Sequence, residues 1–276
     1  MRLQRICILF IGLMLCSGLV KGQIKWLDSY DLAKVLAKEQ NKLIVVDCWA
    51  RWCGPCLAMD NKVWSDSKIQ SYADRFIFVK LDLSSGFSNK NFAVKAIPAI
   101  FICDAWNSKL KNFIGYKDKM EMSKILNSFG FDISKVYLDK QKVKDGVFEG
   151  KDVLKLAMTY YEVSLDIDRD ASLAMKSLSK QNFKEVVKYF KKEKNHIWMN
   201  RSILLSFLNR VPKRRLKVLR GIKINDRENL MLQNALLAKS YFELNKKEKA
   251  KVYFEQVKTI SLPYCDFLKE ERTLLH

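Results

Sequence analysis

The sequence contains few of the residues that build metal sites or disulfide frameworks. Among its 276 residues only His196 and His276 are histidines, and they lie far apart. Five of the seven cysteines remain when Cys7 and Cys16, in the apolar N-terminal segment, are set aside: Cys48, Cys53, Cys56, Cys103 and Cys265. An odd number does not make a framework of paired disulfides. A structural zinc site needs four ligands, so we expect no metal and no other cofactor.

Long apolar runs are missing beyond the N-terminus. Arg2 and Arg5 precede an apolar run over Ile6–Leu15, and small residues follow, which is the layout of a secretory signal peptide. The run is shorter than the roughly 20 residues that a membrane-spanning helix needs. We therefore expect residues 1–22 to be a signal peptide and the mature protein to be exported.

The residues around Cys16 allow a second interpretation. Leu13–Cys16 is similar to a bacterial lipoprotein box, although a bulky Leu15 stands where such boxes have a small residue. Lipidation of Cys16 is the one case in which we expect membrane association. The sequence ends Thr273–His276, which is no retention signal for the endoplasmic reticulum, so a bacterial periplasm is the expected location.

Acidic residues are scarce relative to basic ones. The chain has 50 Lys and Arg against 30 Asp and Glu, and the excess lies mainly after residue 130, where 31 basic residues face 19 acidic ones. The basic run Lys213–Arg220 alternates with apolar residues, as in an amphipathic helix with a solvated basic face. Because an exported protein rarely meets nucleic acid, we expect no nucleic-acid partner; acidic proteins or anionic lipid headgroups suit this face better.

The pattern over residues 23–130 is typical of an α/β unit, because short apolar runs rich in β-branched residues alternate with helical stretches. The predicted strands are Ile24–Leu27, Leu43–Trp49, Phe76–Asp82, Ala99–Cys103 and Leu110–Tyr116. After the first strand we expect an amphipathic helix that Asp28 or Ser29 caps, with Leu32, Val35 and Leu36 on its buried face. A last helix over residues 118–129 should end at Gly130.

The second half reads as all α-helical. Strong helix formers dominate it, and only Gly146, Gly150 and Gly221 of the ten glycines lie beyond Gly130. The lysine-rich range 131–150 is predicted to be a linker, and 151–276 a helical domain. The helical apolar spacings before residue 210 are Asp152–Leu165, Ala171–Leu178, Phe183–Phe190 and Ile197–Leu208.

A later stretch resembles a tetratricopeptide repeat, in which two antiparallel helices pack through small and large residues. The residues with that spacing are Leu237, Ala238, Tyr241, Ala250, Phe254, Val257 and Pro263. Such repeats bury their faces against one another, so the upstream helices would complete the array. The resemblance implies a protein partner bound on the helical repeats.

The segment Val46–Cys56 carries the chemistry, with the letters VDCWARWCGPC. It closely resembles the active-site region of thioredoxin, and the resemblance extends over about residues 23–130. Ile97–Pro98, at the start of a predicted strand, is similar to the cis-proline site of that family. The resemblance implies a thioredoxin fold with a central mixed sheet flanked by helices, and a thiol-disulfide oxidoreductase.

The cysteine pair can also be interpreted from physical chemistry. A thiolate is the nucleophile in disulfide exchange, and a helix N-terminus beside Cys53 stabilises that negative sulfur. Cys56 lies one turn along, within disulfide reach, so it can attack a mixed disulfide on Cys53. Pro55 fits because a proline in the first turn loses no helical hydrogen bond. We expect Cys53 and Cys56 to form the redox-active disulfide.

Three more residues gain roles from the resemblance. Asp47, in an apolar strand, would be the buried acid that accepts the proton of Cys56, although a structural role in local hydrogen bonding is the alternative. Trp52 and Pro98 would form part of the substrate surface. Leu57 and Ala99 stand where thioredoxin usually has lysine and threonine, which bears on redox potential and on substrate preference.

Two functions follow as hypotheses. In the first, the chain is an exported enzyme that reduces disulfides in client proteins and is recharged by an unidentified electron donor. Gly54-Pro55 resembles the reducing members of the family. In the second, the helical repeats bind a partner, and the thioredoxin-like domain is a scaffold or a redox sensor. Cys48 and Cys103 lie in apolar strands and are expected to be inert.

Overall fold

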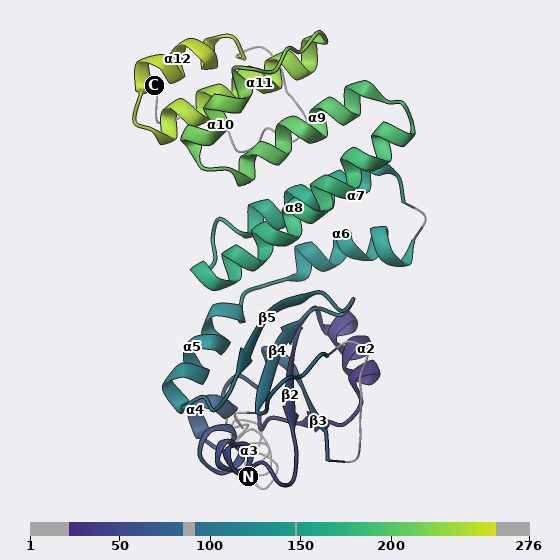
Figure 1. Cartoon of the computed structure of the whole chain (residues 1–276), viewed down its shortest axis with the longest axis vertical. Helices are drawn as coiled ribbons and strands as arrows, with labels where there is room; N and C mark the ends of the chain where they lie inside the picture. The colour runs from purple at the N-terminus through teal and green to yellow at the C-terminus, as the bar shows by residue number, and fades with distance from the viewer. Residues whose placement is uncertain (1–21, 85–91, 147, 258–276) are drawn as a thin grey trace, which may run out of the picture. The chain divides into compact units, whose positions relative to one another are not determined.

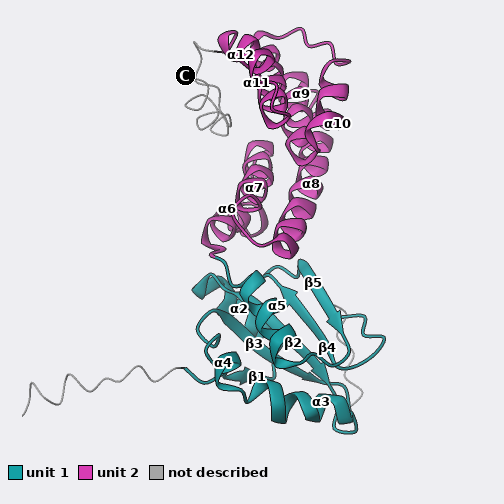
Figure 2. Cartoon of the chain, turned by 90° about the vertical axis from the view of Figure 1, so that its left-hand side faces the viewer, with its two compact units in different colours: residues 1–131 teal, residues 132–276 magenta. Residues whose placement is uncertain are grey.

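The computed structural model describes residues 22–84, 92–146 and 148–257 (Figure 1). The chain divides into two compact units, residues 1–131 and residues 132–276, and each is described by itself (Figure 2). Residues 1–21 of the expected signal peptide, with Cys16, and the later residues Pro263 and Cys265 lie outside the described residues.

Unit 1 is built on a five-stranded mixed sheet with the order β1-β3-β2-β4-β5. Its strands are β1 (Trp26–Leu27), β2 (Leu43–Trp49), β3 (Phe76–Asp82), β4 (Ala99–Cys103) and β5 (Lys109–Ile114). β3 pairs in parallel with β1 and β2, whereas β4 pairs antiparallel with β2 and β5. Six of the seven residues of β2 are buried, as expected for the central strand of a sheet covered on both faces. The predicted fold class is confirmed.

The helices of unit 1 cover both faces of this sheet. α2 (Tyr30–Gln40) lies on one face, and α3 (Gly54–Met59), the π-helical turn η1 (Asp60–Trp64), α4 (Ser67–Gln70) and α5 (Lys119–Phe129) lie on the other (Figure 1). Asp118 and Glu121 form a capping box at the start of α5. The helix ends at Gly130, as predicted.

The predicted buried face of α2 is wrong. Ser29 does cap the helix, but Leu32 and Val35 are 46% and 51% exposed. Ala33 and Ala37 are fully buried in their place. Small side chains let a helix backbone approach a sheet closely. The size of the side chains, and not their hydrophobicity alone, therefore determined which side of α2 is buried.

Unit 2 is helical. Its helices are α6 (Ser134–Asp145), α7 (Gly150–Val163), α8 (Arg169–Lys192), α9 (His196–Ser206), α10 (Pro212–Leu219), α11 (Arg227–Glu243) and α12 (Lys247–Glu255), with a 3-10 turn, η2 (Phe207–Asn209), after α9. Helices that follow one another along the chain pack together in the pairs α6–α7, α7–α8, α8–α9, α10–α11 and α11–α12. Among the described residues no helix is both long enough and apolar enough to cross a membrane.

Two sequence expectations for unit 2 need correction. The expected linker 131–150 contains α6, whose Val136, Tyr137 and Val143 are buried while most of its lysines are exposed. The expected helices 171–178 and 183–190 are one helix, α8. Ser179 lies between these two expected helices. Its hydroxyl donates to the backbone carbonyl of Ala157 at 2.8 Å, so the buried polar side chain has a partner and the helix continues through it.

The prediction of a solvated basic face for Lys213–Arg220 is correct only in part. Residues 212–219 form α10, as expected, but Arg215 is buried, at 2% exposed. Its guanidinium donates to the carboxylate of Glu243 at 3.0 Å and to the backbone carbonyl of Phe207 at 3.1 Å. This arginine is part of the core, not of a solvated face.

Candidate active site

The cysteine pair lies where the central strand gives way to a helix. β2 ends at Trp49, three residues follow, and Cys53 is the N-cap of α3. The backbone N–H of Cys56 donates to the Cys53 Sγ at 3.2 Å, so the first turn of the helix points an amide at this sulfur. Cys53 and Cys56 form a disulfide with an S–S distance of 2.01 Å and a Cα–Cα distance of 5.2 Å. The site therefore contains a pair of sulfurs that can store two electrons.

The disulfide lies in a small hydrophobic cluster, and the next residue before it, Trp52, is exposed. Cys53 and Cys56 form a buried cluster with Ala50, and Ile97 packs against that cluster. The two cysteines are almost equally buried, at 5% and 3% exposed, so accessibility in the disulfide form does not separate their roles. The position of Cys53 at the helix N-terminus does.

The residues expected to hold a substrate differ in exposure. Trp52 is 74% exposed, and Leu57, one residue beyond the pair, is 43% exposed. The Ile97–Pro98 bond is cis, which confirms that expectation. Pro98 itself is buried, whereas Ile97 is half-buried next to the disulfide cluster. Contact with a bound chain would thus fall to Ile97 and the local backbone more than to the proline ring.

Asp47 is a buried acid close behind the site. It lies in β2, is 3% exposed, and its Oδ1 makes no hydrogen bond to any described residue. Burial raises the pKa of Asp47 to about 7; the Lys80 ammonium partly offsets the rise, and the Asp60 carboxylate adds to it. A carboxyl with this pKa can accept and return a proton near neutral pH.

Lys80 and Asp60 were missed by the sequence analysis. Lys80 lies in β3 directly opposite Asp47, with its Nζ 4.0 Å from Asp47 Oδ2 and ion-paired with the Asp60 carboxylate. The same Nζ lies 5.0 Å from the ring centre of Trp26 and 5.2 Å from that of Trp49. Asp60 follows Cys56 by one helical turn, and its N–H donates to the Cys56 carbonyl. In the sequence, Lys80 could have been noticed as the one lysine in the apolar run 76–82. Its pairing with Asp47 could not have been predicted, because it depends on the register of the two strands.

Cys48 and Cys103, the other cysteines of unit 1 that the structure describes, lie in the core. Burial raises the pKa of both Cys48 and Cys103 to about 12, so neither forms a thiolate near neutral pH. In the part of the chain that the structure describes, no three His, Cys, Asp or Glu side chains gather as metal ligands would. Cys53 and Cys56, which form the disulfide, are thus the redox pair among the described residues of this unit.

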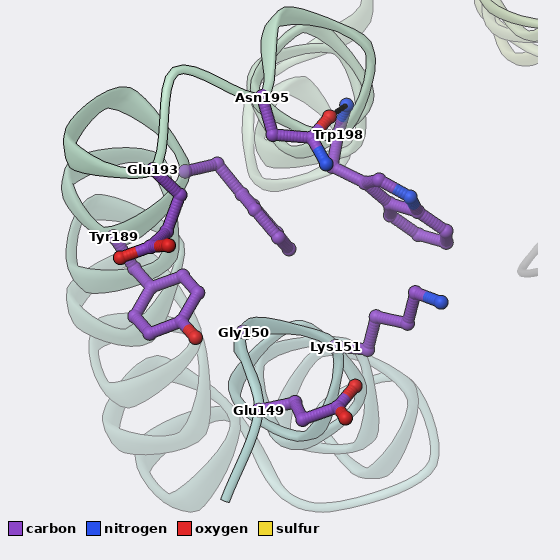
Figure 3. A pocket seen from close by; sticks show the side chains of 8 residues that line it. Glu149, Gly150, Lys151, Tyr189, Glu193, Asn195 and Trp198 are labelled. Carbon is purple, nitrogen blue, oxygen red and sulfur yellow. Dashed lines mark hydrogen bonds between the residues drawn. The ribbon is translucent and has the colours of Figure 1, made fainter.

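Unit 2 has a separate concave feature of about 390 Å³ at the junction of α7, α8 and α9. Tyr189, Lys151 and Trp198 reach it from different helices, and Glu149 and Glu193 stand at its rim (Figure 3). The Lys151 Nζ lies 4.8 Å from the Trp198 ring centre. We refer to this feature as the α7–α9 pocket.

Comparisons with known proteins agree with this geometry. A family model described as Thioredoxin-like matches residues 25–105. Thioredoxin-1 of Drosophila melanogaster is 30% identical over 86 residues, which make up 31% of this chain and 78% of that protein. Thioredoxin H2 of Arabidopsis thaliana is 38% identical over 89 residues, or 30% of this chain and 62% of that protein.

Among solved structures, the oxidised C-terminal domain of DsbD from Neisseria meningitidis is 16% identical, with a TM-score of 0.34, and covers 38% of this chain and 99% of that one. The sequence relatives and the disulfide at the N-terminus of α3 lead to one conclusion. The chain belongs to the thioredoxin family, and it is a thiol-disulfide oxidoreductase.

Proposed function

We propose that this protein is exported and reduces disulfides in client proteins, with Cys53 as the attacking cysteine and Cys56 as the resolving one. The observation that carries the proposal is the position of Cys53 as the N-cap of α3, disulfide-bonded to Cys56. In the reduced protein the helix N-terminus favours the thiolate form of Cys53. The signal peptide expected at residues 1–22 supports export.

The exchange takes place in two steps. The Cys53 thiolate attacks one sulfur of a client disulfide, a new S–S bond forms to the client, and the second client sulfur leaves as a thiolate. The Cys56 thiol then loses its proton and attacks the Cys53 sulfur. This restores the Cys53–Cys56 disulfide and releases the client in its reduced form. An electron donor must return two electrons to the pair before the next turnover.

Asp47 is the proposed proton acceptor for Cys56. With a pKa of about 7 it is partly ionised at neutral pH, so it can take the thiol proton and later give it up. Lys80 and Asp60 act through Asp47 as positioning residues, because one lowers and the other raises its pKa. Trp52, with the backbone at Ile97–Pro98, forms the proposed surface for the client chain.

The roles of Lys80 and Asp60 can be tested by the pH dependence of the resolving step. Asp60→Asn should lower the pKa of Asp47 and move the profile to lower pH, whereas Lys80→Met should move it to higher pH. Stopped-flow measurement of mixed-disulfide decay at several pH values would follow the shift. The matched control is Lys62→Met, because Lys62 is an exposed lysine on the same π-helical turn as Asp60. Two profiles that move together would show that neither charge acts through Asp47.

Trapping experiments test the assigned order of attack. Cys56→Ser removes only the second step, so mixed disulfides between Cys53 and client proteins should accumulate, and mass spectrometry would identify them. Cys53→Ser should yield few adducts, since Cys56 lacks the helix N-cap position. The double variant serves as the background. Equal adduct levels in both single variants would refute the roles given to the two cysteines.

The second candidate function is capture of a protein partner by the helical unit. The α7–α9 pocket is the observation that favours it, because three aromatic side chains meet there within a hollow open to solvent. Reduction of insulin disulfides in the presence of dithiothreitol separates the candidates. An enzyme should accelerate the reaction, and a scaffold should do no better than buffer. A pocket variant, Tyr189→Ala, should then change which clients are trapped without changing insulin reduction.

A further inference from the structure

We propose that α8 carries a docking face for anionic membrane lipids. Four exposed lysines of this helix, Lys180, Lys184, Lys188 and Lys191, form what we call the lysine face. They are spaced four, four and three residues apart, and residues at those spacings are neighbours on one side of a helix. The proposal concerns a surface of unit 2 and does not depend on the reaction at Cys53.

The lysine face is directed away from the core of unit 2. The apolar residues of α8, which include Met175, Phe183, Val186 and Phe190, are buried. At 3.6 residues per turn these residues occupy one side of the helix, and the four lysines occupy the opposite side. α8 packs against α7 and α9 through its apolar side, with α7 alongside it in Figure 1. The ammonium groups are therefore free to meet a partner.

No acidic side chain of the described residues forms an ion pair with the lysine face. Glu185 lies close by on α8, but its carboxylate accepts from the Gln181 amide at 3.3 Å. Like charges at these spacings repel one another, so the arrangement weakens the helix slightly. The negative C-terminal end of the helix favours Lys191 but does not reach Lys180 or Lys184 in the middle.

The composition of the face favours lipid over protein or nucleic acid. Protein interfaces are rich in Arg, Tyr and Trp and poor in Lys. Grooves that bind single-stranded nucleic acid combine positive charge with aromatic side chains that stack on the bases. The lysine face has no arginine and no aromatic residue; its exposed neighbours include Ser177 and Leu173. An anionic bilayer needs only concentrated positive charge with no shape match, and this is what the face presents.

Vesicle binding tests the proposal. The chain without residues 1–21 keeps every described element and removes the apolar N-terminal segment, which could insert by itself. It should sediment with phosphatidylcholine vesicles that contain roughly 30% phosphatidylglycerol, should not sediment with pure phosphatidylcholine, and should be released by high salt. Replacement of all four lysines of the face by Gln should weaken the partition coefficient at least about tenfold at low salt.

A matched variant separates the face from net charge. Gln at Lys142, Lys144, Lys223 and Lys249 removes the same charge from exposed positions of unit 2 outside α8 and outside the basic run Lys213–Arg220, and it should weaken binding less than about threefold. Circular dichroism would confirm that both variants remain folded, and insulin reduction should be unchanged in both. Equal loss in the two variants would overturn the proposal in favour of a general charge effect. Binding to a poly-glutamate peptide without binding to the vesicles would overturn it in favour of an acidic protein partner.

Discussion

The two units differ in how many polar side chains they bury and in how the buried charges are paired. Among the described residues, unit 1 buries three polar or charged side chains, Asp47, Asp104 and Ser123, whereas unit 2 buries fourteen. In unit 2 the buried charges have close ionic partners: Arg215 binds Glu243 and Arg201 binds Glu228. Asp139 Oδ1, which makes no hydrogen bond among the described residues, lies 2.9 Å from the Lys155 ammonium. In unit 1, Asp47 keeps one oxygen without a hydrogen bond to any described residue and has a raised pKa.

This difference separates structural from chemical burial. A buried ion that is fully hydrogen-bonded fixes how helices pack, and removing its partner is costly. A buried acid that lacks a full set of partners is less stable as an ion, so its proton is available to chemistry near neutral pH. Buried charge holds helices together in the helical unit, and in the α/β unit the proposed role of the buried Asp47 is proton transfer.

The largest expected effect tests the structural half of this comparison. Arg215→Ala leaves Glu243 and several carbonyls without their donor, so unit 2 should lose about 3 kcal/mol of unfolding free energy. Urea unfolding followed by circular dichroism would report on unit 2, which holds most of the helix. Arg214→Ala, at the exposed neighbouring position, should change stability by less than about 0.5 kcal/mol. Equal effects from the two variants would contradict a structural role for Arg215.

The next largest expected effect tests the raised pKa of the buried Asp47 in unit 1. The pKa of Asp47 is raised from 3.8 to about 7 in the folded state, so between these values the folded protein holds a proton that the unfolded chain has lost. Stability should therefore fall as the pH rises from about 4 to about 7 and then level off. Asp47→Asn should flatten this slope and stabilise the oxidised protein at pH 8, on the order of 2–4 kcal/mol.

Tryptophan fluorescence can follow this change in unit 1, because five of the six tryptophans lie before residue 131. The control is Asp74→Asn, since Asp74 is exposed. An unchanged pH slope in Asp47→Asn would mean that the acid is not the titrating group. The same variant should slow the resolving step roughly a hundredfold at pH 7, by loss of the proposed proton acceptor.

Two glycines sharpen the comparison between the units, because each begins a helix. A Cβ at Gly150, the first residue of α7, would lie 2.5 Å from Tyr189 Cδ1 and 2.7 Å from Phe190 Cζ. Gly150→Ala should cost unit 2 about 1–3 kcal/mol through overpacking. A Cβ at Gly54, the first residue of α3, meets nothing within 4 Å, so Gly54→Ala should stay within about 0.5 kcal/mol. Thermal unfolding would measure the stability change of each variant. Equal changes in the two variants would contradict the expected overpacking at Gly150.

The smallest effect concerns the helix caps, which the two units share. Asp118 with Glu121 caps α5 in unit 1, and in unit 2 the Asp152 carboxylate accepts from the Glu149 N–H at the start of α7, at 2.9 Å. Asp118→Ala should lower the stability of unit 1 by about 1 kcal/mol and leave unit 2 unchanged, and Asp152→Ala should do the reverse. Denaturation of each variant with both optical probes would detect the separation. A shift of both probes in either variant would show that the units unfold together.

Local sequence was sufficient to predict several elements. β2, β3 and β4 have the predicted bounds, because β-branched runs of that length between turn residues have few alternatives to a strand. The cap at Ser29 and the end of α5 at Gly130 were predictable because helix-terminal residues act on the nearest few backbone groups. The cysteine spacing also fixed the disulfide, since residues three apart on a helix start lie within bonding distance.

Other features depend on contacts between distant residues. Leu32 and Val35 had the hydrophobicity of a buried face, but the sheet selected Ala33 and Ala37 for their size. Arg215 was one of several basic residues in a run, and only its packing beside Glu243 made it part of the core. No local pattern records such choices, because they depend on what the opposing element leaves room for.

The sequence by itself determined the α/β character of residues 23–130, the helical second half and the disulfide partners, because propensity, capping and short spacing act within a few residues. Tertiary structure alone decided the surroundings of the acid behind the disulfide. Strand register places Lys80 opposite Asp47, and a helical turn brings Asp60 to the same ammonium. The raised pKa of Asp47 is a property of that enclosure, since burial and fixed charges act through space and not along the chain.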